Sequence, residues 1–313
     1  MFVGHEAVAF AAVGLLARRL GVSRERALAL GVAAALFAAV PDVDMAYAPV
    51  GLLDVHGASP LAAANAFWTA STAVHRTVTH SVLLAPVGAA TFALAAARTR
   101  RADVAAGALG VGLVALAEVV TGPLGAFVMA LYVLAGVAIA VAAARRLALG
   151  PRAVALTALV GLASHPFGDL LTGTPPHFLY PLPIRLFAAR PAVSPDPTVD
   201  LLAAFALELA CIWAGVYAYH ALTGSSLRSR LDGRAVAGAG YALVALVLTP
   251  PTLTVSYPFV FSVVAVGAVG AVPGPLKRRL PSPADAAVTG LAAVTVAALA
   301  YAAVYYGTHV AHW

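Results

Sequence analysis

Four short motifs place histidine and aspartate side chains at fixed spacings in a chain that contains few charged residues. They are G-H-E at 4–6, P-D-V-D at 41–44, H-R-T-V-T-H-S at 75–81 and S-H-P-F-G-D at 164–169. Imidazole nitrogens and carboxylate oxygens without thiolates are ligands typical of zinc, manganese, iron or magnesium. The motifs therefore predict a divalent metal site. Because the candidate ligands exceed one tetrahedral shell, we expect two ions, most simply zinc, with manganese or iron as alternatives.

The spacing within two motifs predicts how their side chains are presented. His165 and Asp169 are four residues apart, and a helix places such residues on one face. His75 and His80 are five residues apart, so both can point to one centre only if the segment between them bends. The two motifs thus predict a helix face and a bent loop that converge on the metal.

The remaining polar residues indicate hydrolysis of a phosphoester. Pro41 disfavours helical geometry for the residue before it, and an extended P-D-V-D would aim Asp42 and Asp44 the same way. Two ions about 3.5–4 Å apart suit phosphodiester hydrolysis by a metal-activated water. We expect Asp42 or Asp44 to orient or deprotonate that water. Arg76 would bind the phosphate, because a guanidinium matches phosphate oxygens in a bidentate geometry.

The composition shows what kind of fold must position these residues. Charged residues make up 10% of the 313 residues and hydrophobic residues 62%, whereas soluble domains carry about 25% charged residues. We predict an all-α polytopic helical membrane protein of about ten spans, several of them short. About six helices of a hydrolase-like membrane domain fall in 1–200 and four more in 201–313. The spans are expected near 6–20, 27–40, 80–97, 104–121, 124–144, 153–165, 201–221, 235–250, 255–273 and 284–306.

The basic residues predict the orientation in the membrane. Alternate connections hold 16 of the 19 basic residues, in five clusters: Arg18, Arg19, Arg24, Arg26; Arg98, Arg100, Arg101; Arg145, Arg146, Arg152; Arg228, Arg230, Arg234; and Lys277, Arg278, Arg279. The positive-inside rule makes that side cytoplasmic, so both termini and the four motifs are expected outside, at the cell membrane. Membrane lipids are the expected partners and a lipid headgroup is a natural substrate. No nucleic acid partner is expected, since no basic stripe lies beside aromatic residues.

Taken together, the motifs resemble those of the YdjM-type family of membrane-bound metal-dependent hydrolases. The likeness rests on His5, P-D-V-D, H-R-T-V-T-H-S and H-P-F-G-D followed by T-G-T-P-P, and covers roughly residues 1–200. That family is similar in ligand pattern to zinc-dependent phospholipase C and the zinc single-strand nucleases. The resemblance implies that His5, Asp42, His80, His165 and Asp169 are metal ligands, with His75 and Asp44 as further ligand or base. The family's H-L-L-x-D has Pro-Phe-Gly in its middle here, and a second H-x-x-x-D or H-x-x-x-E is missing from the later sequence.

Other residues and other functions fit parts of the pattern. Further candidates for the site are His177, Glu118, Asp200 and Glu208. Simple loop or tail positions are expected for Asp54, His56, Asp196, His309 and His312. A transporter would also place ionisable residues in a helical bundle, and a structural membrane protein could use a metal only to join helices. The gathering of the motifs at one face favours the hydrolase.

Overall fold

The computed structural model describes residues 3–53, 55, 57, 59–247, 249–273 and 280–310. Of the residues discussed above, Asp54, His56, His312 and the basic cluster at 277–279 lie outside these ranges. Within the described ranges the protein is helical, apart from an isolated β-bridge between Thr252 and Val255. The chain divides into two compact units, Met1–Arg190 and Pro191–Trp313.

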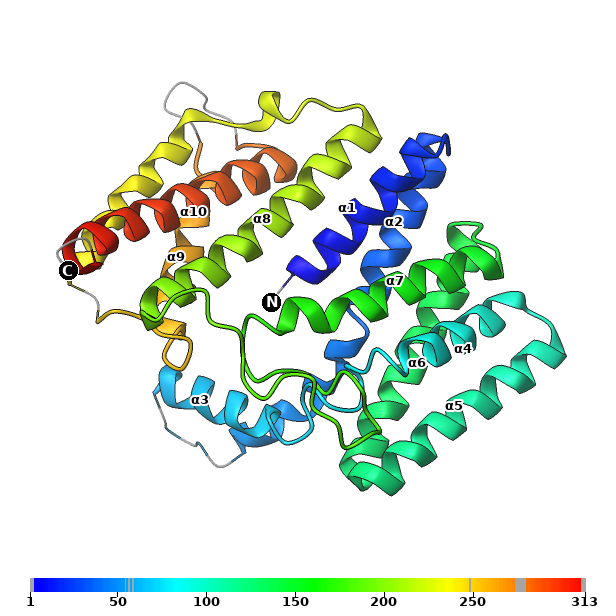
Figure 1. The fold of residues 1–313 in the computed structure, drawn as a ribbon. Coiled ribbons are helices and arrows are strands. Elements are labelled where there is room, and N and C mark those ends of the chain that lie inside the picture. Colours follow the sequence, from blue (N-terminus) through cyan, green and yellow to red (C-terminus); the bar gives the residue numbers. More distant parts are fainter. Residues whose placement is uncertain are drawn as a thin grey trace. The chain divides into compact units, whose positions relative to one another are not determined.

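The first unit carries the four motifs on a bundle of helices (Figure 1). Helix α1 packs on α2, and both pack on α7, while α4 packs on α5, α6 and α7. The bounds are α1 Gly4–Arg19, α2 Arg24–Ala38, the 3-10 helix η1 Pro41–Leu52, α3 Pro60–Ser71, α4 Ala85–Ala97, α5 Arg100–Thr121, α6 Pro123–Arg146 and α7 Pro151–Asp169.

The second unit is built around α10, which contacts α8, α9 and the 3-10 helices η3 and η4. Its core is aromatic, with Phe259 and Tyr301 fully buried against each other at a ring-centroid distance of 5.0 Å. The bounds are α8 Pro197–Thr223, η2 Arg228–Arg230, η3 Gly233–Leu246, α9 Tyr257–Ala265, η4 Val266–Ala271, α10 Pro283–Tyr305 and the π-helix η5 Tyr306–Val310.

Several helices begin where the sequence supplies an N-cap. Side-chain oxygens of serine, threonine or aspartate accept a hydrogen bond from the first turn, which satisfies a backbone N–H that has no helical partner. Proline often follows at the first helical position, where its missing N–H costs nothing. The capping residues are Ser23 for α2, Ser59 for α3, Thr99 for α5, Asp196 for α8 and Ser282 for α10.

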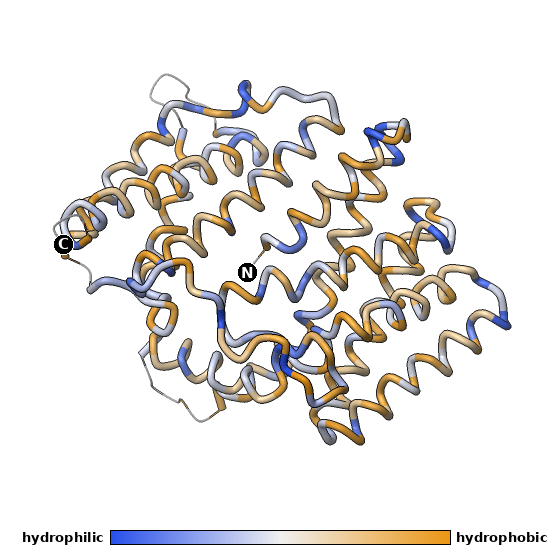
Figure 2. Tube along the Cα trace, in the orientation of Figure 1, coloured by the Kyte–Doolittle hydropathy of each residue, from blue (hydrophilic) through white to orange (hydrophobic). Residues whose placement is uncertain are grey.

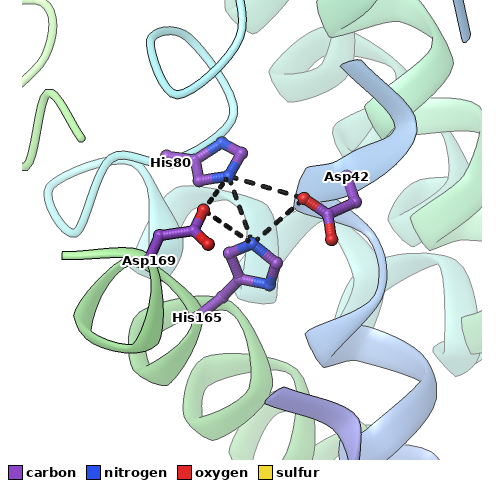
Figure 3. Close-up of side chains that lie close together, drawn as sticks. All are labelled: Asp42, His80, His165 and Asp169. Carbon is purple, nitrogen blue, oxygen red and sulfur yellow. Dashed lines mark hydrogen bonds and ion pairs between the residues drawn. The ribbon is translucent and has the colours of Figure 1, made fainter. Parts of the chain in front are cut away.

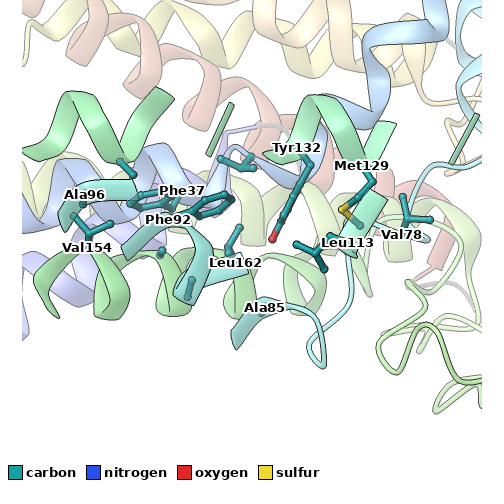
Figure 4. Close-up of a cluster of buried hydrophobic side chains, with 14 of the residues drawn as sticks. Phe37, Val78, Ala85, Phe92, Ala96, Leu113, Met129, Tyr132, Val154 and Leu162 are labelled. Atoms are coloured by element: carbon teal, nitrogen blue, oxygen red, sulfur yellow. The ribbon is translucent and has the colours of Figure 1, made fainter. Parts of the chain in front are cut away.

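The core of the first unit joins α2, α4, α6 and α7 (Figure 4). Phe37 stacks on Phe92 with ring centroids 5.6 Å apart, and Phe92 also contacts Tyr132. A Cβ added at Gly136 would lie 1.9 Å from the Phe92 ring. The glycine is therefore required for the close approach of α6 to α4.

The structure does not support ten membrane spans. Among the described residues, four helices are long and apolar enough to cross a membrane, namely α5, α6, α8 and α10 with η5. The number of candidate spans rises to five if α2 and η1, which meet at a bend of 42°, form one broken span. The other expected segments are also helical, but α1, α2 and α4 have 16, 15 and 13 residues. At 1.5 Å per residue these helices are shorter than a hydrocarbon core of about 30 Å.

The arginine clusters of the first unit lie at the ends of helices, away from the motifs. Figure 2 shows hydrophilic residues at the connections from α1 to α2, α4 to α5 and α6 to α7. The first and third of these connections meet, because Nη1 of Arg26 donates to the carbonyl oxygen of Ala148 at 2.7 Å. Helices α2 and α7 both begin at these arginine-containing connections. Helix α2 ends shortly before Asp42, and α7 ends at Asp169. The unit therefore has a basic end and a motif end.

Replacing Gly161 by alanine should destabilise the first unit, because its Cβ would lie 2.7 Å from the carbonyl oxygen of Ala34 and from the nitrogen of Ala38. Backbone cannot yield as a flexible side chain does, so α2 and α7 must separate at a cost of about 1–3 kcal/mol. Thermal unfolding of the purified protein measures the change. Gly112→Ala is the matched control, since a Cβ there meets nothing within 4 Å, and it should be neutral or slightly stabilising. Equal melting temperatures for the two variants would contradict this close packing.

Candidate metal centre

Three separate segments bring four of the predicted ligands together. Asp42 comes from the first turn of η1, His80 from the turn-rich segment before α4, and His165 and Asp169 from the last turns of α7. Figure 3 shows the four side chains pointing toward one another. One ligand atom from each lies within 4.8 Å of all the others, so this group could hold a metal ion.

The distances between these atoms fit a tetrahedral ion. The Nε2 atoms of His80 and His165 are 3.1 Å apart. Oδ2 of Asp169 lies 3.1 Å from the first and 3.6 Å from the second. Oδ1 of Asp42 lies 3.7 and 3.3 Å from the same two nitrogens. Ligand atoms bound about 2.0–2.1 Å from a tetrahedral zinc are about 3.3 Å apart, which is close to the spacing seen here.

The other ring nitrogens show which atoms carry the protons. Nδ1 of His165 lies 2.7 Å from the carbonyl oxygen of Ala38, which only accepts, so this nitrogen is protonated. Oγ1 of Thr79 donates to Asp44 and therefore accepts from Nδ1 of His80 at 2.9 Å. In the neutral rings both Nε2 atoms then direct lone pairs toward each other and toward two carboxylates. A positive charge between these atoms, carried by a metal ion or by protons on the rings, balances this convergence.

Three of the four side chains of the cluster are buried. His80 and His165 are 0% exposed and Asp169 is 2% exposed, whereas the side chain of Asp42 is 32% exposed. Burial alone would lower the pKa of His80, but the carboxylates of Asp44, Asp169 and Asp42 outweigh it and raise the pKa above its usual value. The centre is therefore a buried cluster that is open to solvent on the Asp42 side.

A second group, Asp44, His75 and His80, could also hold an ion by the distances between its atoms. Its carboxylate is already well provided with donors, since Oδ1 of Asp44 lies 2.9 Å from Nδ1 of His75. Oδ2 accepts from the backbone N–H of Arg76 and the hydroxyl of Thr79, both at 3.1 Å, and lies 3.4 Å from Nδ1 of His80. This pattern is typical of a carboxylate that orients metal-bound histidines from outside.

His5 borders the cluster from α1. Its ring stacks on that of His165 with centroids 3.9 Å apart, and its Nε2 lies 3.3 Å from Oδ1 of Asp169. His5 belongs to neither convergent group among the described residues. His5 thus lies beside Asp169 and contacts Oδ1, whereas His80 contacts Oδ2.

Arg76 is engaged by the protein in this structure. Its guanidinium donates to Nε2 of His75, to the carbonyl and a carboxylate oxygen of Asp169, and to Thr172 and Thr174, at distances of 3.0–3.2 Å. The expected contact of Arg76 with a phosphate stays a prediction. The contacts present link it instead to the loop that follows α7.

The P-D-V-D segment is helical, and the expectation that it is extended was wrong. Val40 has φ −62° and ψ −39° although a proline follows, and η1 begins at Pro41. Residues two apart on a 3-10 helix point to different sides. Asp42 accordingly faces the first group, whereas Asp44 faces the second.

Two other expectations from the spacing are confirmed. His165 and Asp169 share one face of α7, with 3.6 Å between Nε2 and Oδ2. The segment from His75 to His80 consists of turns, and the two rings meet edge to face with centroids 5.4 Å apart.

The further candidates lie in different places. The backbone N–H of His177 donates to the carbonyl oxygen of Arg76, so His177 adjoins the site. Glu118 is exposed on α5. Asp200 and Glu208 are buried in the second unit, where Asp200 accepts from the backbone of Val193.

Three contributors were missed by sequence reasoning. Thr79 bridges His80 to Asp44, the Ala38 carbonyl oxygen orients His165, and Thr172 accepts from the arginine. The threonines lie within the H-R-T-V-T-H and T-G-T stretches, so their proximity to ligands was a usable signal. The backbone carbonyl carries no signal in the sequence.

The fold and the site together define a helical membrane protein with a buried histidine–aspartate cluster that could hold a metal. A comparison with protein families matches residues 1–309 to the family described as YdjM inner membrane protein. The chain therefore belongs to this family, and the likeness extends beyond the first 200 residues, where the motifs lie. Comparisons with curated proteins and with solved structures found no match.

Proposed function

We propose that the chain is a membrane-embedded, metal-dependent hydrolase of phosphoesters, phosphodiesters above all. The observation that carries the proposal is the convergence of two imidazole Nε2 atoms and two carboxylate oxygens in the first unit. Oxygen and nitrogen donors without thiolates suit zinc and manganese, and both ions support hydrolysis by an activated water.

The residues that would hold the ion are Asp42, His80, His165 and Asp169. Zinc held there would supply Lewis acidity, and it would lower the pKa of a water that joins or replaces Asp42 at the exposed side of the group. We propose one ion at this group, because the Asp44 carboxylate already accepts from Nδ1 of His75, the backbone N–H of Arg76 and the hydroxyl of Thr79. The two ions expected from the number of ligands stay a prediction that metal stoichiometry tests.

The open side of the cluster suggests a role for Asp42. It is the most exposed of the four groups, whereas the other three are held by neighbours on all sides. A substrate would therefore approach past Asp42, which is placed to accept a proton or to orient a water. The exposure of Asp42 supports this role, and turnover of a phosphodiester tests it.

The proposed location is the extracytoplasmic end of the membrane domain. Membership of an inner membrane family supports the membrane, and the positive-inside rule assigns the basic end of the first unit to the cytoplasm. The motif end, where α1 begins, would then open to the opposite side. Membrane lipids are within reach there, so a phospholipid headgroup is a proposed substrate.

The proposal predicts one zinc or manganese ion per chain in the detergent-purified protein, measured by elemental mass spectrometry. The same preparation should hydrolyse bis(p-nitrophenyl) phosphate, or phosphatidylglycerol presented in vesicles, and lose this activity with a chelator. His165→Ala should lose both metal and activity because it removes a central ligand. His309→Ala, on an exposed position of the second unit, is the control and should retain both.

Two results would contradict the proposal in different ways. A wild-type protein that binds no metal after reconstitution would remove its basis and leave a transport pathway as the use of the buried cluster. A protein that binds metal tightly and hydrolyses no phosphoester would favour a metal that only joins the helices. Hydrolysis of the soluble diester without the phospholipid would retain the activity and reject the lipid headgroup.

A further inference from the structure

We infer that Arg76 is a positioning residue, which fixes the Asp169 carboxylate so that only Oδ2 is presented to the metal. The inference rests on the proposed function, because it concerns the same site. It assigns to Arg76 a role different from phosphate binding. The contacts of the guanidinium, the backbone conformation of Arg76 and the neighbouring Gly173 support this role.

The guanidinium contacts one carboxylate oxygen of Asp169, and the other oxygen faces His80. Nη2 of Arg76 lies 3.2 Å from Oδ1, and Nε2 of His5 lies 3.3 Å from the same oxygen. Oδ2 faces Nε2 of His80 at 3.1 Å. Nη1 also donates to the backbone carbonyl of Asp169 at 3.0 Å, so both the side chain and the backbone of this residue are held. A carboxylate fixed in this way offers one oxygen as a ligand.

The same side chain also holds the neighbouring segments. Nη1 donates to the carbonyl oxygen of Thr174 at 3.1 Å, and Nη2 to Oγ1 of Thr172 at 3.2 Å. Nε lies 3.2 Å from Nε2 of His75, to which it donates. The planar fork of arginine can reach these acceptors together, whereas a lysine ammonium cannot reproduce its geometry.

The backbone of Arg76 is held in an unusual conformation. Its φ is +62°, a left-handed value that is uncommon for residues other than glycine. The N–H donates to Oδ2 of Asp44 at 3.1 Å, and the carbonyl accepts from the N–H of His177 at 2.9 Å. Such strain persists where surrounding contacts determine the conformation. The backbone therefore aims the guanidinium at Asp169 while it fixes Asp44.

Gly173 provides the space for this arrangement. A Cβ at Gly173 would lie 2.7 Å from Nη1 and 3.2 Å from Cζ of Arg76. An alanine there would displace the guanidinium and leave its charge in the protein. The chain thus offers a second way to disturb the arginine without replacing it.

The test measures zinc affinity of the full-length protein by competition with a chelator, and the visible absorption of bound cobalt(II). Arg76→Lys keeps the charge and should lower zinc affinity about 10–100-fold, the range found for residues that orient ligands. It should also change the cobalt spectrum, because a released carboxylate can bind through both oxygens. Gly173→Ala should show smaller changes in the same direction. Arg185→Lys, at an exposed position of the following loop, is the control and should match the wild type.

The outcomes separate this inference from the proposed function. If Arg76→Lys binds zinc and cobalt as the wild type does, the inference is overturned and the proposed function stands. If Arg76→Lys fails to fold, Gly173→Ala decides, and a wild-type affinity and spectrum for it would overturn the inference. A wild-type protein that binds neither zinc nor cobalt overturns the proposed function. It also overturns the inference, because Arg76 would then have no metal ligand to position.

Discussion

Asp169→Asn should lose its metal and its turnover together. The carboxylate of Asp169 lies between the histidine nitrogens on one side and Arg76 and His5 on the other. An asparagine has nearly the same size, but its amide must place N–H donors either against the guanidinium or toward the cluster. We expect zinc affinity to fall by more than about 100-fold, beyond the range for outer residues, and hydrolysis to fall to background.

Asp103→Asn is the matched control for this loss. Asp103 is exposed in the first turn of α5, away from the cluster, so the same chemical change should leave metal content and turnover unaltered. Elemental mass spectrometry and phosphodiester turnover on the same samples provide the comparison. An Asp169→Asn protein with full metal and full turnover would remove Asp169 from the site.

The sequence predicts the parts of the site that depend on local periodicity. His165 and Asp169 share a face because the helix repeat requires it, and the five-residue separation of His75 and His80 required the bend that is observed. The convergence of distant motifs followed from their position at the ends of successive apolar segments. Their assignment as ligands stays a prediction, and it is supported by the geometry of the cluster.

The parts that depend on tertiary context could not be predicted. The helical form of Val40 overrides the usual effect of the proline after it, and this separates Asp42 from Asp44. The orientation of His165 depends on a carbonyl oxygen of α2, which every residue possesses.

The number of spans was overestimated for a related reason. Apolar composition identifies helices, but it does not distinguish a short helix packed in the protein from one that crosses a bilayer. Helix α4, for example, has 13 residues and buries Phe92 in the core of its unit. Helix length and apolar composition together set the count of candidate spans, since α7 has 19 residues and is not among them.

Asp44→Asn should weaken zinc binding without removing a ligand. Asp44 is 0% exposed and its two oxygens face Nδ1 of His75, the backbone N–H of Arg76, the hydroxyl of Thr79 and Nδ1 of His80. An amide would set N–H against some of these donors, each at a cost of about 1–3 kcal/mol. The histidines would then lose their orientation, and zinc affinity should fall about 10–100-fold.

X-ray absorption on the zinc-saturated protein decides between an orienting carboxylate and a ligand. If Asp44 acts from outside, Asp44→Asn and wild type have the same number and type of zinc ligands, and Thr79→Val shows a smaller loss of affinity of the same kind. One oxygen ligand fewer in Asp44→Asn would make Asp44 a ligand itself. Since Asp44 faces Nδ1 of His80 and the first group uses Nε2, that result would place a second ion on the opposite side of the same imidazole, which would have to lose its Nδ1 proton to solvent to bind both ions. Two ions bridged by one ring are too far apart to share a water, so hydrolysis would still depend on the Asp42 side alone.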